Sequence, residues 1–376
     1  MNRPHVLFVV PSYNAHGGLE RYNHDVVQAL TSAGATVHAV CLYECTRPEG
    51  DDFSARVLRP KWWRANIYFG RIWPHLLKRY LSHYDACCNL VVAAHVFCLP
   101  AALDFARRRG VPCWNLAFGL EVWGEIRSDY ALALREAERL ITISEYTRKR
   151  IIESSGRQKT IDIIAPAVDV DEFIPKTVSR QDDTIRLLTV GRLQGGERSK
   201  GHDLVIDALG ILRTENIQGI EYWIVGEGPD LRHLERIAHA RGVNEQVKFC
   251  GRVDDRYLPD IYNQCDIFVM PSFVAQNESG KWTGEGFGIV YIEASACEKP
   301  VIGCTEGGQT DCIIDGETGL LVEPTAESVA MAIRKLVDDR VLAREMGRKG
   351  RKYVLSHFTR DHFNVKWRGL LNSDVS

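Results

Sequence analysis

Two glutamates separated by seven residues frame a glycine-rich entry to a predicted helix. Glu285 precedes a Gly-Phe-Gly segment, and Glu293 lies about two turns into the apolar run 289–296. Because Pro300 cannot continue a helix, this helix must end before it. The first N–H groups of a helix lack partners within it and lie at the positive end of its dipole, so they attract phosphates. Carboxylates accept hydrogen bonds from paired hydroxyls, and the whole set suits a nucleotide sugar.

A second glycine-rich loop carries two cations. It follows the predicted strand 185–190, begins with Gly191 and Arg192, and reaches Lys200 just before the next predicted helix. Two cations beside a diphosphate can neutralise it as it leaves, which is the role that a metal ion has in other enzymes. A single basic residue after a strand is usually only exposed, so the interpretation depends on the pair.

The segment EGFGIVYIEASA and the pattern Gly-Arg … Lys-Gly-x-Asp that starts at Gly191 resemble the signature of the family-4 retaining glycosyltransferases. The resemblance spans essentially the whole chain and is strongest over residues 187–324. It implies that Glu285 meets hydroxyls of the donor sugar and that Glu293 holds the ribose hydroxyls. The catalytic residues would be Glu285, Arg192 and Lys200, with Gly191 also at the donor. It also implies that the amides of Phe287, Gly288, Ile289 and Val290 bind the diphosphate, and that Gly286 belongs to the same donor-binding segment.

Two further segments resemble family landmarks around the donor. VKFCGRV, residues 247–253, is similar to the strand and turn whose backbone reads the base, which nominates Arg252 and Val253. GGLERY is similar to the first helix entry of the family, which places Gly17 and Gly18 against the diphosphate or the acceptor. Base recognition through the backbone leaves no side-chain record, so UDP and GDP donors are not separated.

One position departs from the family pattern. AFGLEVWG, residues 117–124, matches a family segment that usually reads His-Gly-x-Glu/Asp, and its His contacts the donor sugar in relatives. Phe118 stands in its place here. His95 and His16 are the candidates to take over that contact.

The elements that position these residues alternate between short β-rich runs and helices, which predicts parallel sheets. Ligands of such sheets bind beyond the carboxyl ends of the strands. We expect the α/β class and, from the resemblance, GT-B architecture with two Rossmann-like domains facing across a cleft. The expected parts are an acceptor-binding domain over residues 1–176, a nucleotide-sugar domain over 177–352, and a final helix over 353–376 that crosses back to the first domain.

The chain offers little sign of a metal or another cofactor. Asp169 and Asp171 form an Asp-x-Asp pair, but this pair precedes a linker, whereas the metal-binding Asp-x-Asp of the other glycosyltransferase fold follows a strand. We therefore expect no metal and no cofactor, with the nucleotide sugar as substrate.

The composition of the chain indicates which partners and which cellular compartment to expect. The chain has 376 residues, 45% hydrophobic and 26% charged, with a net charge of −2, which argues against bulk nucleic-acid binding. Its 11 cysteines are scattered and fit reduced thiols. We expect neither a signal peptide nor a membrane span, and a cytoplasmic protein.

Residues 56–80 are the most unusual stretch, because Arg and Lys alternate there with Trp, Tyr and Phe and no acid interrupts them. Such a mixture fits anionic lipid headgroups or a phosphate-bearing acceptor, and also a solvated helix whose aromatic residues pack inward. The first alternative would place the protein at the inner membrane face.

Together these observations predict a retaining, metal-independent glycosyltransferase that moves a sugar from a nucleotide donor to a hydroxyl of a glycan or a polyprenyl- or lipid-linked acceptor. The expected context is polysaccharide or glycolipid synthesis. Two alternatives stay open: a GT-B-type epimerase or hydrolase, and a non-catalytic nucleotide-sugar-binding protein, which only Phe118 favours.

Overall fold

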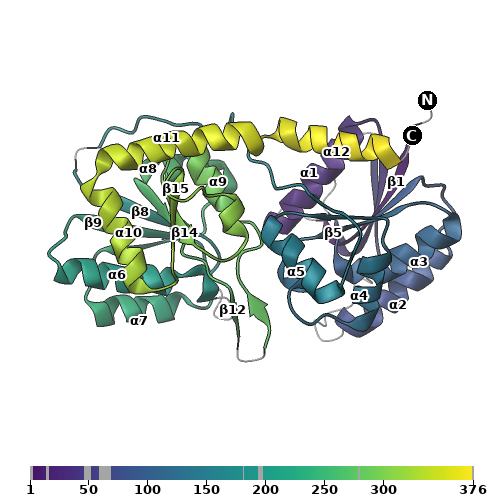
Figure 1. The fold of residues 1–376 in the computed structure, drawn as a ribbon, viewed down its shortest axis with the longest axis horizontal. Helices are drawn as coiled ribbons and strands as arrows, with labels where there is room; N and C mark the ends of the chain where they lie inside the picture. The colour runs from purple at the N-terminus through teal and green to yellow at the C-terminus, as the bar shows by residue number, and fades with distance from the viewer. Residues whose placement is uncertain are drawn as a thin grey trace. The chain divides into compact units, whose positions relative to one another are not determined.

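The computed structural model describes residues 3–13, 17–45, 52–58, 69–180, 182–193, 198–277 and 280–374 of the chain. It divides into two compact units: Met1–Pro166 with Asp361–Ser376, and Ala167–Arg360. Each unit holds one parallel sheet covered by helices (Figure 1), which confirms the predicted α/β class.

The sheet of the first unit has seven strands in the order β3-β2-β1-β4-β5-β6-β7, and all its described pairs are parallel. Its central strands are buried on both sides, as continuous apolar runs require. The strands are β1 (His5–Tyr13), β2 (Thr36–Cys45), β3 (Phe53–Val57), β4 (Leu90–Ala93), β5 (Cys113–Ala117), β6 (Arg139–Thr142) and β7 (Ile161–Ile163). Its helices are α1 (Gly18–Ser32), α2 (Phe69–Ser82), α3 (Leu99–Arg109), α4 (Ser128–Glu136), α5 (Glu145–Ser155) and α12 (Arg360–Asp374).

The last helix, α12, packs on this first unit. The Trp367 ring lies 6.4 Å from the Trp114 ring, centroid to centroid. Asp374 at the end of the helix accepts hydrogen bonds from Arg139 at 2.8 Å and from the Trp114 indole at 2.9 Å. The hydrogen bonds from Arg139 lower the pKa of Asp374, so its carboxylate stays ionised and holds the end of the chain in place.

The sheet of the second unit has six strands in the order β10-β9-β8-β11-β14-β15, again parallel. Helices α6, α7 and α10 pack side by side, and α9 packs against α8 and α11. The strands are β8 (Ile185–Val190), β9 (Ile220–Val225), β10 (Val247–Gly251), β11 (Ile267–Val269), β14 (Val301–Cys304) and β15 (Gly319–Val322), with a hairpin of β12 (Ala275–Gln276) and β13 (Trp282–Thr283). The helices are α6 (His202–Thr214), α7 (Leu231–Arg241), α8 (Leu258–Gln264), α9 (Ile289–Ala296), α10 (Ala326–Asp338) and α11 (Arg340–His357).

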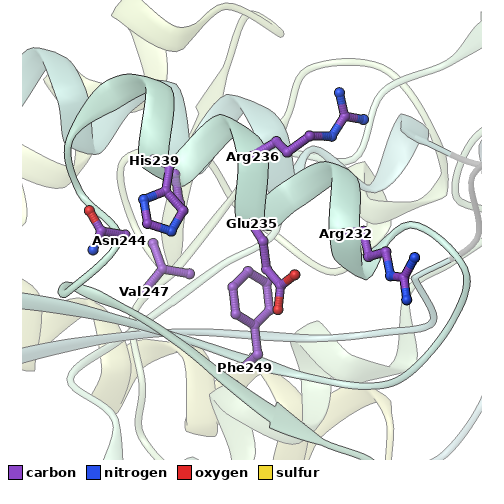
Figure 2. A pocket seen from close by; sticks show the side chains of 8 residues that line it. Arg232, Glu235, Arg236, His239, Asn244, Val247 and Phe249 are labelled. Carbon is purple, nitrogen blue, oxygen red and sulfur yellow. The ribbon is translucent and has the colours of Figure 1, made fainter.

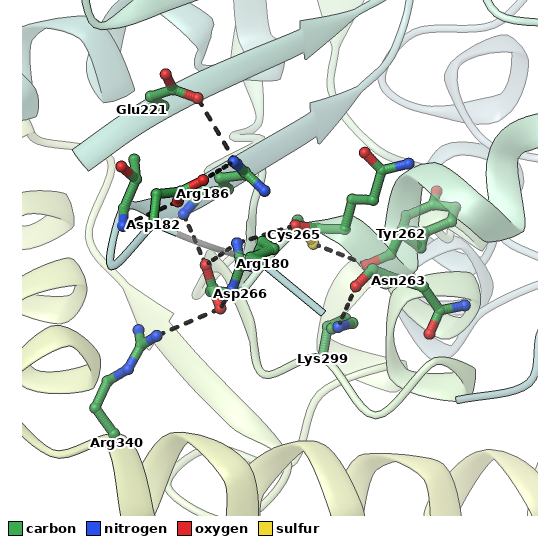
Figure 3. Close-up of polar contacts among 12 residues, drawn as sticks. Arg180, Asp182, Arg186, Glu221, Tyr262, Asn263, Cys265, Asp266, Lys299 and Arg340 are labelled. Carbon is green, nitrogen blue, oxygen red and sulfur yellow. Dashed lines mark hydrogen bonds and ion pairs between the residues drawn. The ribbon is translucent and has the colours of Figure 1, made fainter. Parts of the chain in front are cut away.

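Residues that precede the expected division between 176 and 177 already contact the second unit. The Asn263 side chain of α8 accepts from the backbone N–H of Lys176 at 2.7 Å and donates to the carbonyl of Ile174 at 2.9 Å. Arg180 forms a two-pronged ion pair with Asp266, shown in Figure 3. These contacts tie residues 174–180 to the second unit, which begins at Ala167.

Two helices, α11 and α12, form the last part of the chain that the structure describes. α11 ends at His357 and α12 begins at Arg360. The carbonyl of Phe358 accepts from the backbone N–H of Val168 at 2.9 Å, and Val168 pairs with Thr359 in a β-bridge. The backbone between the two helices is therefore bonded to the linker and does not continue one helix.

Candidate functional site

The predicted residues of the second half gather at one edge of its sheet. Gly191 and Arg192 directly follow β8, while Arg252 and Val253 follow the end of β10. Since β8 to β11, β14 and β15 are parallel, their carboxyl ends share this edge, which is where α/β sheets bind ligands.

The entry to α9 has the form that the sequence predicts. The helix spans Ile289–Ala296, and Gly288 at its N-cap has a left-handed backbone with φ 91°. A Cβ there would lie 2.5 Å from the ring of Tyr291, so only glycine fits. Gly288 has no side chain with which to cap this end. The first amides of the helix are therefore available to an anion.

The segment after β14, which contains Gly308 and Gln309, contacts the entry to α9. The backbone N–H of Gly308 donates to the carbonyl of Glu285 at 2.7 Å, and a Cβ on Gly308 would lie 2.0 Å from the carbonyl oxygen of Gly286. The buried Gln309 amide donates to the carbonyls of Ser272 at 2.8 Å and Cys304 at 3.0 Å. Sequence reasoning missed Gln309, because a lone glutamine gives no pattern.

Lys200 and Glu285 form an ion pair at the entry to α9. The Lys200 Nζ lies 2.6 Å from the Glu285 Oε2, and the two side chains are only 20% and 16% exposed. The Lys200 loop is tied to the segment after β11, since the carbonyl of Ser199 accepts from the Ser272 hydroxyl at 2.9 Å and from the Phe273 backbone at 2.8 Å. Two of the three residues predicted to act in catalysis are thus in contact.

The other predicted donor-binding side chains differ in exposure. Glu293 is 2% exposed, and its Oε2 accepts from the buried Tyr262 hydroxyl at 2.9 Å. Arg192 and Arg252 are exposed at the carboxyl edge of the sheet, and Arg252 lies 3.9 Å from Glu227. The roles of these residues toward a donor stay predictions, and sequence reasoning missed Tyr262.

The first unit contributes a second glycine entry. Gly17 is the N-cap of α1 with φ 108°, and as a glycine it has no side chain with which to cap that helix. A Cβ on Gly18 would meet nothing within 4 Å, whereas a Cβ on Gly17 would lie 2.4 Å from the Glu20 Oε2. Both glycines are exposed, as a ligand-facing position requires, and their predicted role is untested.

Phe118 is built into the first unit as a core residue. Its ring meets Tyr22 edge to face at 5.4 Å, and its backbone N–H donates to the Glu121 carboxylate at 2.5 Å. His95 caps a short helix by accepting from the Phe97 backbone at 3.1 Å. Burial lowers the pKa of His95, while the charge of Glu121 acts in the opposite direction. His16, the other substitute, lies outside the described residues.

The basic aromatic stretch is described only in part, because residues 59–68 lie outside the described residues. Arg56 is exposed on β3, and its guanidinium lies over the Tyr80 ring at 5.4 Å from the centroid. No described helix has the length and apolarity to cross a membrane.

The Asp-x-Asp pair and the metal-binding side chains can be located in the structure. Asp169 of the Asp-x-Asp pair accepts from the backbone of Asp171 at 3.1 Å and pairs with Arg360 at 3.3 Å, so it serves the local turn. The described part of the chain shows no group of three metal-binding side chains.

A hollow between α7 and β10, shown in Figure 2, is lined by His239, Asn244 and Phe249 among others, and by none of the predicted site residues.

We expect the second unit to lose stability in acid because of His202, which follows the Lys200 loop. Burial, and after it the charge of Lys200, lowers the pKa of His202 from 6.5 to about 4. The unfolded chain therefore binds more protons between these values, and stability falls as the pH drops from 6.5 toward 4. The free energy of unfolding should fall by about 3 kcal/mol over that window. Chemical denaturation of His202→Gln should show a flatter pH dependence, whereas exposed His239→Gln should follow the wild type.

The same steep loss of stability in His202→Gln and the wild type would contradict this assignment. The pH dependence would then come from other groups.

Comparison with known proteins places this chain in a family. Residues 16–172 match the model of Glycosyltransferase Family 4, and residues 170–353 match that of the glycosyl transferases group 1. A GDP-mannose-dependent alpha-(1-6)-phosphatidylinositol monomannoside mannosyltransferase of Mycobacterium tuberculosis is 33% identical over 238 residues, which are 62% of this chain and 61% of the relative. The chain thus spans less than two thirds of that curated relative.

Solved structures match over nearly the whole chain. Sucrose-phosphate synthase of Thermosynechococcus elongatus has a TM-score of 0.79 at 22% identity, covering 99% of both chains. Anabaena HepE, solved with UDP and glucose, has a TM-score of 0.75 at 18% identity, covering 99% of this chain and 100% of its own. These structures show the fold, and the two family models together show the family. The chain belongs to the family-4 glycosyltransferases and has the GT-B type of fold.

Proposed function

We propose that the chain is a retaining, metal-independent glycosyltransferase that moves a sugar from a nucleotide donor to a hydroxyl of a glycan or lipid-linked acceptor. The Lys200–Glu285 pair beside the uncapped entry to α9 carries this proposal. It puts a cation, a hydroxyl-binding carboxylate and free backbone amides at one helix end. A nucleotide sugar has a diphosphate between two polyols, which matches those three groups.

In the proposed reaction, the bond from the anomeric carbon to the β-phosphate oxygen breaks. A bond from the acceptor oxygen to that carbon forms on the same face, and the leaving phosphate oxygen takes the acceptor proton. Lys200, Arg192 and the amides that begin α9 stabilise the charge that develops on the diphosphate. A double displacement through Glu285 is less well supported, because this carboxylate is already paired with Lys200.

Relatives suggest which donor and acceptor to try first. The Mycobacterium tuberculosis relative is named for GDP-mannose and a phosphatidylinositol mannoside, and Anabaena HepE was solved with UDP and glucose. We infer that GDP-mannose is the first donor to test and an inositol-bearing lipid the first acceptor. The exposed Arg56 belongs to the basic aromatic stretch that would bind such an anionic headgroup at the cytoplasmic membrane face.

Thermal unfolding with a panel of GDP, UDP and ADP sugars tests the donor site. A ligand that binds only the native state raises the midpoint according to its concentration over its dissociation constant. One nucleotide class should stabilise the wild type, and Glu293→Ala should lose that shift. Equal shifts in both proteins would contradict the role of Glu293, and no shift with any sugar would contradict donor binding.

Sugar transfer tests the reaction itself. With the stabilising donor, loss of donor should depend on an inositol-lipid, glycan or polyprenyl-linked acceptor and give a product of retained configuration. Donor conversion without any acceptor would favour an epimerase or hydrolase. Binding without turnover of any kind would favour the non-catalytic alternative, for which the buried Phe118 is the specific observation.

A further inference from the structure

A buried hydroxyl–carboxylate pair joins α8 to α9 behind the proposed donor site. The Tyr262 hydroxyl donates to the Glu293 Oε2 at 2.9 Å, and the two residues are 0% and 2% exposed. A carboxylate with so little contact with water needs hydrogen-bond donors from the protein to stay ionised. Tyr262 supplies one such donor.

The direction of this hydrogen bond is fixed by the environment. Burial, and after it the charge of Glu293, raise the pKa of Tyr262 well above its ordinary value. The phenol therefore keeps its proton and donates, and Glu293 accepts. The contact is charge-assisted, which makes it stronger than a bond between neutral groups.

The Tyr262 ring is held by packing, so its hydroxyl has one position. Phe173 and Phe268 lie against it, with ring centroids 5.8 Å and 5.9 Å away. The next residue, Asn263, bonds the backbone of the incoming linker at Ile174 and Lys176. Figure 3 shows Tyr262 and Asn263 side by side on α8. A hydroxyl fixed in this way can select one rotamer of its partner.

We propose that Tyr262 is a positioning residue that fixes the Glu293 carboxylate for the ribose hydroxyls of the donor. The inference rests on the proposed function, because it takes the ribose as the group that Glu293 meets. Tyr262 does not touch the donor in this proposal. It acts by holding Glu293 in the rotamer that binds the ribose.

The experiment measures how strongly the protein prefers ribonucleotides to their deoxy analogues. We would titrate wild type, Tyr262→Phe and Glu293→Ala with GDP and UDP beside their 2′-deoxy and 3′-deoxy analogues by calorimetry. The wild type should prefer the ribonucleotide, and Glu293→Ala should lose that preference. Tyr262→Phe should weaken ribonucleotide binding about tenfold, the size of one hydrogen bond to a charged group, and leave binding of the deoxy analogues nearly unchanged.

Tyr222→Phe is the matched control. Tyr222 is equally buried in the same unit, but its hydroxyl is hydrogen-bonded to the Thr189 hydroxyl at 2.7 Å. It should affect stability and leave the ribose preference intact. In a Glu293→Ala background, Tyr262→Phe should weaken ribonucleotide binding no further.

The outcomes separate the two proposals. If Glu293→Ala loses the preference and Tyr262→Phe keeps it, the positioning role is wrong and the donor site stands. If Tyr262→Phe weakens ribose and deoxy nucleotides equally, the hydroxyl is only structural. If the wild type shows no ribose preference, the assignment of Glu293 fails and the inference fails with it.

Discussion

Lys200→Ala should lower kcat for sugar transfer by about 100- to 1,000-fold, the effect of removing one preorganised group that stabilises developing charge. The Lys200 Nζ lies 2.6 Å from Glu285 beside the entry to α9, in a segment fixed by bonds to the loop after β11. The charge is therefore in place before the diphosphate leaves. KM should change less than kcat, because the charge develops fully only as the bond breaks.

The ion pair complicates this variant, since Lys200→Ala also leaves the 16%-exposed Glu285 carboxylate without its cation. Stability should fall by about 2 kcal/mol, between the values of exposed and buried pairs. The double variant Lys200→Ala with Glu285→Gln removes that unpaired charge and should recover much of the stability without recovering kcat. Exposed Lys248→Ala is the control and should keep full activity. Near wild-type kcat in Lys200→Ala would contradict the leaving-group role.

Local patterns predicted the elements that carry the site well. The bounds of α9 and β8 match the predicted ones, since glycines, a proline and apolar runs mark their ends. The helix α5 has boundary residues of the same kind, with Ser144 as its N-cap and Gly156 as its C-cap. The fold class followed from the alternation of such elements.

Contacts between residues far apart in the chain could not be predicted from the sequence. Lys200 and Glu285 are 85 positions apart, and Tyr262 and Glu293 are 31 apart. Each residue lies on an element whose position depends on the whole sheet. The resemblance nominated three of these four, but a tyrosine on the seven-residue helix α8 carries no motif. Strands of two residues, such as β12, are too short to show any alternation, and their segment reads as a loop.

Gly308→Ala should destroy the donor site without touching a charged group. A Cβ at this position would lie 2.0 Å from the carbonyl oxygen and 2.3 Å from the carbonyl carbon of Gly286, and 2.6 Å from the nitrogen of Phe287. All three atoms are backbone, so no side-chain rotation can relieve the overlap. The entry to α9 must shift, and stability should fall by about 2 kcal/mol, as for overpacked cores.

Nucleotide affinity should fall by more than the stability loss explains, because a shift of the entry to α9 displaces the amides of residues 287–290, which are the proposed diphosphate contacts. Titration of folded Gly308→Ala with the stabilising nucleotide should give a dissociation constant at least about tenfold higher, the loss of one charge-assisted hydrogen bond. Gly369→Ala on α12, whose Cβ meets nothing within 4 Å, should bind normally and gain helix stability. Unchanged affinity in Gly308→Ala would mean that the diphosphate does not bind at this helix end. The Lys200 variant could still be inactive in that case, so the pair of variants separates the cation from the amides.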